Sequence, residues 1–457
     1  MPIIIHPLLK EISRLFQSSG KQVYLVGGAV RDMLRKTKNH DWDLATDAQP
    51  AEVSSIFASV KGYAKVIPTG IKHGTVTVLY RGHNMEITTF RTETGYSDGR
   101  RPDAVNYAAT IEEDLSRRDF TMNAIALRLP CSTIIDPFGG VKDIKAKIIR
   151  CVGDARARFA EDGLRPLRAV RFAAQLAFRL DPDTLGAISG ALAVSAKVSP
   201  ERVRDELNKI LASPAPSTAF LLMEKTGLLR LFLGELAACR GVEQKGFHSF
   251  DVLDHCLLAL DYAAKNEYPL ELRLAALLHD IGKPAARKTG ENGIFTFYRH
   301  EEISAAQSRE ILQRLRYPNA VIDAVCHLVK EHMFHYTEDW NDGAVRRFIA
   351  RVGENNLQSL YRLRRADAYA MAARENYPAF LVQLAQRVEE VLAKSNVLSL
   401  KDLAVSGTDL MGIGIKPGKA MGAILSQLLE TVLNDPQENT REKLLLIAGK
   451  IAENQRR

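Results

Sequence analysis

The sequence is poor in cysteine and tryptophan and has no long apolar run. Five cysteines occur among 457 residues, and none has the CxxC spacing typical of a thiolate zinc site. This scarcity excludes a disulfide framework and favours a reducing compartment. No apolar run approaches the roughly 20 residues that a membrane helix needs, and the beginning MPIIIHPLLK lacks the charged region and cleavage site of a signal peptide. We therefore expect a cytoplasmic protein with no membrane partner.

The charge balance is only mildly basic. Lys and Arg number 62 and Asp and Glu 54, which gives a formal net charge of +8. An excess of this size permits a nucleic-acid partner but does not require one. Hydrophobic residues make up 46% and charged residues 25%, so the chain can bury a core and is not disordered. Its length predicts two to four structural units.

The character of the chain changes near residue 150. Before it, short β-rich segments alternate with helical ones, and we predict strands at 22–26, 41–44, 75–80 and 84–90, the last two joined by a hairpin loop at 81–83. After it the pattern is almost entirely helical, as in 155–178 and 201–211. The predicted class is α+β, with a small head containing a mixed or antiparallel sheet and mostly α-helical parts behind it.

A phosphate-binding turn and a pair of carboxylates stand out in the head. Gly27 and Gly28 follow the first strand and precede a helix, where a tight turn can bring backbone N–H groups close to a phosphate. Asp41 and Asp43 alternate on a strand, so both carboxylates can face one Mg²⁺ site, and Glu86 could supply a third. Each feature alone usually has no function: two glycines mark a turn, two alternating aspartates mark a solvated surface, and the glutamate is an ordinary strand residue. Their order along the chain favours the functional interpretation.

The chain resembles the class II tRNA nucleotidyltransferases, the CCA-adding enzymes, whose superfamily also includes bacterial poly(A) polymerases and the CC-adding and A-adding enzymes. The resemblance runs almost continuously through residues 20–240 and rests on seven segments in the right order: VGGAVRD (26–32), DWDLAT (41–46), TFRTETGYSDGRRPDAV (89–105), RRDFTMNAIAL (117–127), DPFGGVKDI (136–144), EDGLRPLRAVRFA (161–173) and ERVRDEL (201–207).

The resemblance implies roles for individual residues. Asp41 and Asp43 would hold the catalytic Mg²⁺ ions. The other implied nucleotide-binding residues are Gly27, Gly28, Arg31, Arg118, Asp119 and Asn123, with Glu161, Asp162 and Arg165 reading the base. A carboxylate can accept from the amino group that C and A share, which would exclude G and U. A helix with an ordinary ion pair is the alternative for 161–165. A solvated basic face is the alternative for Arg165, Arg168 and Arg171, and for Arg171 we prefer it.

The segment after Phe90 bears on the product. The resemblance associates such a loop with the change from C to A addition, and CC-only enzymes lack it. Residues 91–102 are present here, with Arg91 and Arg100 as expected RNA contacts. This argues against a CC-only enzyme and leaves CCA addition and A addition open.

A second chemistry begins near residue 245. The segments that carry His255 and the His279–Asp280 doublet have helical periodicity, so neighbouring helices could present them to one metal. Imidazole and carboxylate ligands without thiolate favour Mn²⁺, Ni²⁺, Co²⁺ or Zn²⁺, and a metal-bound water of lowered pKa could attack a phosphate ester.

This pattern, with LLHDIGKP in full, resembles the HD superfamily of metal-dependent phosphohydrolases. The resemblance implies four ligands, His255, His279, Asp280 and Asp367, with His300 and His332 on the phosphate side. It also implies phosphatase and 2′,3′-cyclic phosphodiesterase activity. The remaining histidines of this region are expected to be packing or surface residues: His248, His327 and His335.

The last part of the chain resembles the RNA-binding tail of the same nucleotidyltransferases. Its glycines and proline predict a loop before a helix, formed by Gly412, Gly414, Pro417, Gly418 and Gly422. Lys416 and Lys419 would contact RNA phosphates. A helix–loop–helix packing unit is the alternative.

Together these features predict a nucleotidyltransferase head (1–150), a neck with the base-reading element (151–240), an HD phosphohydrolase domain (241–375) and an RNA-binding tail (376–457). The predicted reaction is the template-independent addition of CCA to tRNA from CTP and ATP. The alternatives are an A-adding enzyme, a poly(A) polymerase, and an HD phosphohydrolase whose head only binds RNA. The sequence indicates no particular oligomeric state.

Overall fold

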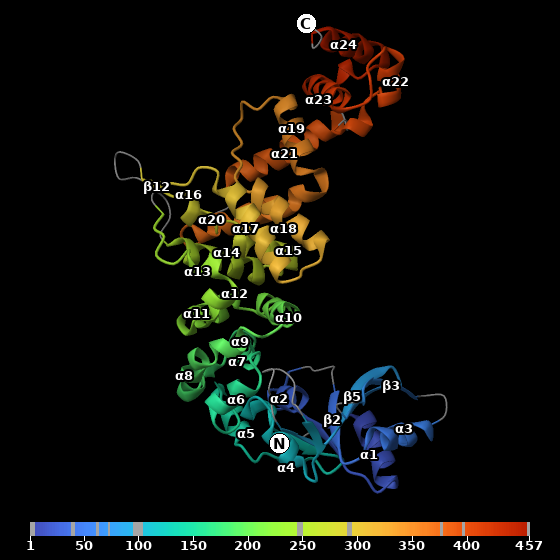
Figure 1. Ribbon diagram of the computed structural model, residues 1–457, viewed down its shortest axis with the longest axis vertical. Helices are drawn as coiled ribbons and strands as arrows, with labels where there is room; N and C mark the ends of the chain where they lie inside the picture. The colour runs from blue at the N-terminus through green and yellow to red at the C-terminus, as the bar shows by residue number, and fades with distance from the viewer. Residues whose placement is uncertain are drawn as a thin grey trace. The chain divides into compact units, whose positions relative to one another are not determined.

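The computed structural model describes residues 5–37, 42–60, 64–71, 74–94, 104–244, 250–289, 295–374, 378–394 and 398–454. The chain forms two compact units. One is Met1–Ala237 together with Arg314–Arg316, and the other is Ala238–Gln313 together with Tyr317–Arg457. Figure 1 traces both from blue to red along the chain.

The first unit is built on a mixed sheet of seven strands in the order β3-β4-β5-β2-β1-β8-β9. Only β2 and β5 pair in parallel among these neighbours. This confirms the predicted α+β class with a mixed sheet in the head. The strands are β1 (Val23–Val26), β2 (Trp42–Thr46), β3 (Ala64–Gly70), β4 (Thr75–Tyr80), β5 (His83–Thr89), β8 (Ala126–Arg128) and β9 (Thr133–Ile135).

The predicted hairpin joins β4 to β5 through two residues. Arg81 and Gly82 both have a positive φ, 48° and 80°, which suits the twist of a two-residue turn. Three aromatic rings then pack on one face of the sheet: Phe57 contacts Phe16 at 6.1 Å and Tyr80 at 5.7 Å between ring centroids. Because side chains alternate along β5, Met85 is buried and Glu86 is exposed on the opposite face.

Short helices and a second hairpin surround the sheet. Helices α1 (Pro7–Ser18) and α3 (Pro50–Ala58) lie together beside β3 (Figure 1). A small antiparallel pair, β6 (Arg91–Thr94) and β7 (Ala104–Tyr107), precedes α4. The remaining elements of the head are α2 (Gly28–Leu34), α4 (Ile111–Ser116), the 3-10 turn η2 (Thr121–Asn123), α5 (Gly140–Ala146) and β10 (Ile148–Ile149).

Helices make up nearly all of the rest of the first unit. A short strand β11 (Arg179–Leu180) pairs in parallel with β10. The helices are α6 (Ala155–Glu161), α7 (Arg165–Leu176), α8 (Pro182–Gly190), α9 (Leu192–Ser195), α10 (Pro200–Leu211), α11 (Pro216–Thr226), α12 (Leu228–Phe232) and α13 (Gly234–Ala237).

The second unit begins with a helical bundle in which α14, α15, α18 and α20 pack against one another. A two-stranded hairpin, β12 (Lys288–Thr289) and β13 (Phe295–Thr296), precedes α17. The helices are α14 (Val252–Lys265), α15 (Leu270–Leu278), α16 (Lys283–Ala286), α17 (His300–Arg314), α18 (Asn319–Glu331), α19 (Asp342–Val352), α20 (Leu357–Ala370) and α21 (Ala379–Lys394), with a 3-10 turn η3 (Glu354–Asn356).

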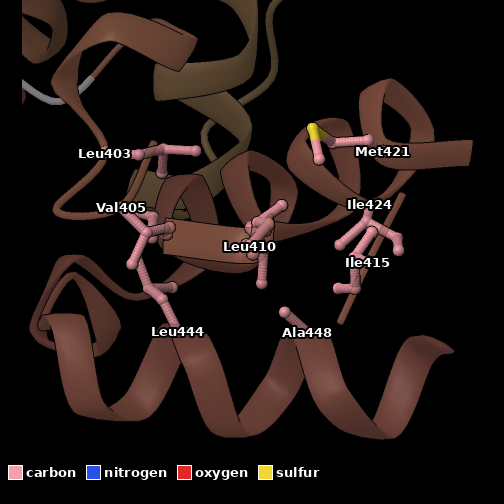
Figure 2. Packing of buried hydrophobic residues seen from close by; sticks show 10 residues of the cluster. Leu403, Val405, Leu410, Ile415, Met421, Ile424, Leu444 and Ala448 are labelled. Carbon is pink, nitrogen blue, oxygen red and sulfur yellow. The ribbon is translucent and has the colours of Figure 1, made fainter. Parts of the chain in front are cut away.

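The end of the chain has a small core of its own. Leu410 lies at its centre and Leu444 and Ala448 face it from the last helix (Figure 2). The elements are η4 (Leu400–Asp402), α22 (Gly407–Gly412), α23 (Lys419–Asn434), η5 (Pro436–Glu438) and α24 (Arg441–Asn454). The predicted loop before a helix is found at 413–418. Two of the five residues predicted for it lie in helices instead: Gly412 ends α22, and Gly422 lies inside α23, because that helix already starts at Lys419.

Candidate active site and a second candidate metal centre

The predicted phosphate turn connects β1 to α2. Gly27 has a φ of 69°, and a Cβ atom there would lie 2.8 Å from Nη1 of Arg118 and 3.8 Å from Oδ2 of Asp43. Glycine is therefore required by the backbone conformation, φ 69° and ψ −135°, and a methyl group there would displace the guanidinium group of Arg118. The turn brings the start of a helix, an arginine and a carboxylate into one place.

The predicted carboxylates lie beside each other on neighbouring strands. Asp43 of β2 is the register partner of Glu86 on β5, and both side chains are exposed. Register partners on one face of a sheet are about 5 Å apart, close enough to share a cation. Asp41 lies outside the described residues. The oxygens of Asp43 and Glu86 are hard ligands of the kind that Mg²⁺ prefers.

A cavity of about 650 Å³ opens beside this turn. It is lined by every predicted nucleotide-binding residue except Glu161: Gly27, Gly28, Arg31, Arg118, Asp119, Asn123, Asp162 and Arg165. Asp43 also lines it, so a carboxylate and many cations share one cavity. A space of this size and charge fits a nucleoside triphosphate.

A buried polar network fixes the side chains at one wall of this cavity. Arg31 donates to Asn123 (2.9 Å), and Asn123 donates to Asp119 (3.1 Å). Asp119 also accepts from Arg168 at 2.8 Å. Burial alone would raise the pKa of Asp119, but the Arg168 charge and the Asn123 hydrogen bond outweigh it and lower the pKa to about 2. Asp119 is therefore ionised at neutral pH.

The base-reading element lies across a helix break. Glu161 ends α6 and Arg165 begins α7, so the continuous helix predicted through 155–178 is wrong at this point. Gly163 sits in the break because a Cβ there would lie 2.4 Å from the carbonyl oxygen of Val194. Pro166, in the first turn of α7, fits only at a helix start.

The break separates the three polar side chains of this element. Glu161 forms an ion pair with Arg165, and Arg165 also donates to the carbonyl of Arg117 at 3.1 Å. Asp162 turns the other way and forms a two-pronged ion pair with Arg202, at 2.9 and 3.3 Å. Asp162 and Arg165 line the cavity. Glu161 does not line it and contacts the cavity only through its ion pair with Arg165.

Arg171 is not on a solvated face, which corrects our expectation. It is 7% exposed, and its Nε lies 2.8 Å from Oε2 of the buried Glu206. Its guanidinium carbon lies 3.9 Å from the ring centroid of Phe172. Burial lowers the pKa of Arg171 to about 10 although Glu206 opposes the shift. The sequence pattern of α7 could not reveal this, because Glu206 is on α10.

Five further cations line the cavity and were assigned no functional role from the sequence: Arg117, Arg168, Arg171, Arg202 and Lys209. Arg117 lies in the segment RRDFTMNA, and Arg202 lies in ERVRDEL. Both segments carry the family resemblance, but no role in nucleotide binding was predicted for these two arginines. The signal that could have found them is the excess of arginine within segments already expected to meet a nucleotide.

A second cluster lies inside the helical bundle of the second unit. His255 is on α14, His279 and Asp280 follow α15, and Asp367 is on α20. Nε2 of His255 lies 3.1 Å from Nε2 of His279 and 3.1 Å from Oδ1 of Asp367. Oδ2 of Asp280 lies 3.4 Å from the same nitrogen. All four side chains are buried, so the predicted ligands converge.

The two predicted phosphate-side histidines join this cluster through the other oxygen of Asp280. Its Oδ1 lies 3.0 Å from Nε2 of His300 and 3.7 Å from Nε2 of His332. In His279, His300 and His332, Nδ1 lies 2.6–2.9 Å from a backbone carbonyl. An Nδ1–H that donates to a carbonyl leaves Nε2 as the ligand atom, which is the arrangement of metal-binding histidines.

The electrostatics of this cluster also suit a cation. Burial alone would raise the pKa of Asp280, but His279 and Lys283 hold it well below its usual range. Burial lowers the pKa of His279, and Asp280 more than reverses this and raises it to about 10. The carboxylates thus hold positive charge at the centre, which a divalent ion would supply more strongly than a proton.

Lys283 also belongs to this site, although we predicted no role for it from the sequence. Its Nζ lies 2.5 Å from Oδ2 of Asp280 and 2.5 Å from Oε1 of Gln244. It is buried, three residues after Asp280 in the segment LLHDIGKP. Its position in that segment is the signal that could have identified it.

The predicted RNA contacts are dispersed. Arg91 begins β6, and Arg100 lies outside the described residues, as does His248. Lys416 and Lys419 are exposed on either side of Gly418, just before and at the start of α23. His327 is half-buried against the carbonyl of Val352 and His335 is exposed, as expected.

Within the described ranges, none of the helices has the length and apolar character needed to cross a membrane.

Three family models match successive parts of the chain. The model described as "Poly A polymerase head domain" matches residues 23–150. The model described as "Probable RNA and SrmB- binding site of polymerase A" matches residues 177–239. A model of tRNA nucleotidyltransferase domain 2 matches residues 287–448. The residues that line the cavity fall within the first match, within residues 162–175 that follow it, and, for Arg202 and Lys209, within the match at 177–239.

Curated relatives named CCA-adding enzyme match this chain, and two of them match it over nearly its whole length. The CCA-adding enzyme of Limosilactobacillus fermentum is 33% identical over 463 aligned residues, covering 99% of this chain and 98% of the relative. That of Lactobacillus delbrueckii subsp. bulgaricus is 35% identical over 95% and 94% of the two chains. The CCA-adding enzyme of Lactobacillus johnsonii is 50% identical over 222 residues, and this match spans about half, 53%, of its length.

Solved structures show the same similarity. The Bacillus stearothermophilus CCA-adding enzyme in complex with CTP has a TM-score of 0.70 and 31% identity, with 99% of this chain and 98% of that chain covered. The Thermotoga maritima CCA-adding enzyme complexed with tRNA has a TM-score of 0.56 at 20% identity and shares the fold.

Proposed function

Because the chain belongs to the family of CCA-adding enzymes, a group of nucleotidyltransferases, we propose that it adds CCA to tRNA 3′ ends from CTP and ATP without a nucleic-acid template. The observation that carries the proposal is one cavity that joins the glycine turn, Asp43 and a wall of arginines. Triphosphate, metal and base each have matching chemistry there.

The head would carry out an in-line attack of the tRNA 3′-hydroxyl on the α-phosphate. Asp41, Asp43 and Glu86 would hold Mg²⁺, which when bound supplies charge for the reacting oxygens. The backbone N–H groups after Gly27 and the side chains of Arg31 and Arg118 would bind the triphosphate. Phosphoryl transfer needs mainly positioning and charge stabilisation, so a rigid polar wall is the appropriate device.

Base selection would rest on Asp162 and Arg165. The carboxylate would accept from the amino group of cytosine or adenine, and the guanidinium would donate to a ring nitrogen or carbonyl. The ion pair with Glu161 would orient Arg165 for this task. G and U present a carbonyl where C and A present the amino group, so they would place an acceptor against the carboxylate of Asp162 instead of a donor.

The finer division of the chain belongs to the same proposal: head (1–150), neck (151–240), HD domain (241–375) and RNA-binding tail (376–457). The break between the compact units at residues 237 and 238 supports the second boundary. Arg91, Arg100, Lys416 and Lys419 would contact tRNA phosphates.

A second activity is favoured by the buried cluster in the bundle. We propose that His255, His279, Asp280 and Asp367 hold Ni²⁺, Mn²⁺ or Co²⁺ and that this site releases phosphate and opens 2′,3′-cyclic phosphates at RNA ends. The bound ion would supply an activated water. His300 and His332 would meet the phosphate, since they approach Oδ1 of Asp280, whereas His255 and His279 approach Oδ2. Such chemistry would suit repair of damaged tRNA ends.

Three other readings remain as competitors. An A-adding enzyme or a poly(A) polymerase would share the same cavity. An HD phosphohydrolase with an RNA-binding head would not need a carboxylate in that cavity. The position of Asp43 in the cavity lining therefore favours nucleotide transfer over simple RNA binding.

The test of transfer is the Asp43→Asn variant, which keeps the shape of the side chain but removes its charge. Incorporation of labelled CTP into a tRNA that lacks CCA should fall by about 10²–10³-fold, as expected for the loss of a catalytic metal ligand. The folded fraction, followed by circular dichroism, should stay the same because the side chain is exposed. Unchanged incorporation would reject the role of the carboxylate.

A further inference from the structure

Asp114 is a buried carboxylate that stands behind the nucleotide cavity rather than in it. It lies on α4 and is 1% exposed. Two arginines of the cavity lining converge on it: Arg117 donates to Oδ1 from Nε (3.0 Å) and Nη2 (2.8 Å), and Arg118 donates to Oδ2 (3.2 Å). One carboxylate thus balances two of the cations that face the cavity.

The two oxygens of Asp114 bind different arginines, and these arginines contact different ends of the cavity: Arg117 contacts the proposed base-reading end and Arg118 the phosphate turn. On the Oδ1 side, the carbonyl of Arg117 accepts from the guanidinium of Arg165, one of the two proposed base-reading groups. On the Oδ2 side, Nη1 of Arg118 lies against Gly27 of the phosphate turn. The same Oδ1 accepts from the backbone N–H of Arg91, where β6 begins, at 3.4 Å.

The charge of Asp114 is retained despite its burial. Burial alone would raise its pKa, but the charges of Arg117 and Arg118 more than compensate and hold the pKa below its usual value. The ionised carboxylate accepts all four of these donated hydrogens. A neutral amide in its place has only one acceptor oxygen and would satisfy fewer of them.

We propose that Asp114 is a positioning residue of the transfer reaction, which holds Arg117 and Arg118 so that the phosphate end and the base end of the bound nucleotide are fixed in register. This rests on the proposed function. Asp114 touches no substrate. Its role is to keep the guanidinium groups of Arg117 and Arg118 in place, so that contact with the phosphates does not draw them out of the geometry that the reaction needs.

The proposal predicts a split between nucleotide binding and turnover. Asp114→Asn keeps the shape of the side chain and leaves both arginines charged, so the cavity becomes more positive and CTP binding is not weakened. Alignment is lost, so kcat for CTP and for ATP incorporation should fall by at least about tenfold. Asp114→Glu keeps the charge and should recover part of kcat.

The experiment measures the Kd of CTP by calorimetry in the absence of tRNA, and kcat and KM with tRNA substrates, on the full chain. Asp143→Asn is the matched control, because Asp143 is also buried, pairs with Arg150 at 3.2 Å and does not line the cavity. It should alter stability but leave kcat per folded molecule unchanged.

Three results would overturn the proposal: an Asp114→Asn variant with wild-type kcat, a parallel loss of CTP affinity and kcat, or a loss of kcat matched by Asp143→Asn. A wild-type chain that binds CTP but incorporates none would instead overturn the proposed function, so the two failures are distinguishable.

Discussion

Asp43 on β2 and Glu86 on β5 are register partners across the parallel pair of strands in the head sheet. The two carboxylates come from segments about forty residues apart, and the strand order places them side by side next to Gly27. Glu86, an ordinary strand residue by sequence pattern, therefore stands where a third metal ligand is expected.

Replacement of Glu86 by Gln should raise the Mg²⁺ concentration that CTP incorporation requires. The variant removes one negative charge from the shared site, so the Mg²⁺ concentration for half-maximal activity should rise several-fold and kcat should fall by about tenfold. Glu112→Gln makes the same chemical change at an exposed position of α4 and serves as the control. An Mg²⁺ titration that is identical for both variants and the wild type would argue against Glu86 as a ligand.

Gly27→Ala should nearly abolish incorporation, whereas Gly20→Ala should not. Both glycines have almost the same positive φ, 69° and 68°, so both variants carry backbone strain. The strain is larger at Gly27, because its ψ of −135° lies outside the left-handed helical region that other residues can adopt. Only at Gly27 would the new methyl group press against Arg118, since nothing lies within 4 Å at Gly20. Incorporation assays and thermal unfolding of the two variants separate the effects. Equal activity losses in both would show that the turn acts only through stability.

Asp119 should stabilise the first unit in a pH-dependent way. Its pKa of about 2 lies below the ordinary value of 3.8, so its ionised form favours the folded state by about 2 kcal/mol above pH 4. That contribution is lost as the pH falls from about 4 towards 2. Urea unfolding of the wild type and Asp119→Asn at pH 6 and pH 3 measures it. The gap in unfolding free energy should narrow at pH 3, and a gap that is constant or grows would contradict the network with Arg168.

The buried cluster of the second unit should bind a transition metal and release phosphate independently of the head. His279→Ala and Asp280→Ala should lose bound Ni²⁺, measured by elemental analysis. Opening of 2′,3′-cyclic phosphates, and phosphate release from RNA ends that carry a phosphate monoester, should each fall by at least about 10²-fold. CTP incorporation should persist in both. His335→Ala, at an exposed position away from the cluster, is the control. Full phosphate release by the two variants would remove the proposed second activity.

Local patterns were sufficient to predict much of the head. The strands at 75–80 and 84–90 alternate apolar and polar residues, and the glycine turn has a recognisable order, so β4, β5 and the turn were predicted within a residue or so. In the second unit, helical periodicity indicated only that His255 and the His279–Asp280 doublet could face one metal, and the full set of four ligands came from the resemblance to the HD superfamily.

Tertiary partners were not predictable. The helix break at Gly163 depends on the carbonyl of Val194 about thirty residues later, and the burial of Arg171 depends on Glu206 of another helix. Lys283 and Asp114 act through partners that only the fold brings together. Sequence periodicity reports which face of an element is apolar, but not which distant charge compensates a buried one.

The most direct test of the central claim is the sequence of tRNA 3′ ends after incubation with the purified chain, CTP and ATP. The substrates are a tRNA that ends at the discriminator base, one that ends in CC, and an unrelated RNA. The account predicts CCA on the first tRNA, a single A on the second and no tail on the unrelated RNA. Addition only to the CC-ending tRNA, or long A tails on the unrelated RNA, would contradict it.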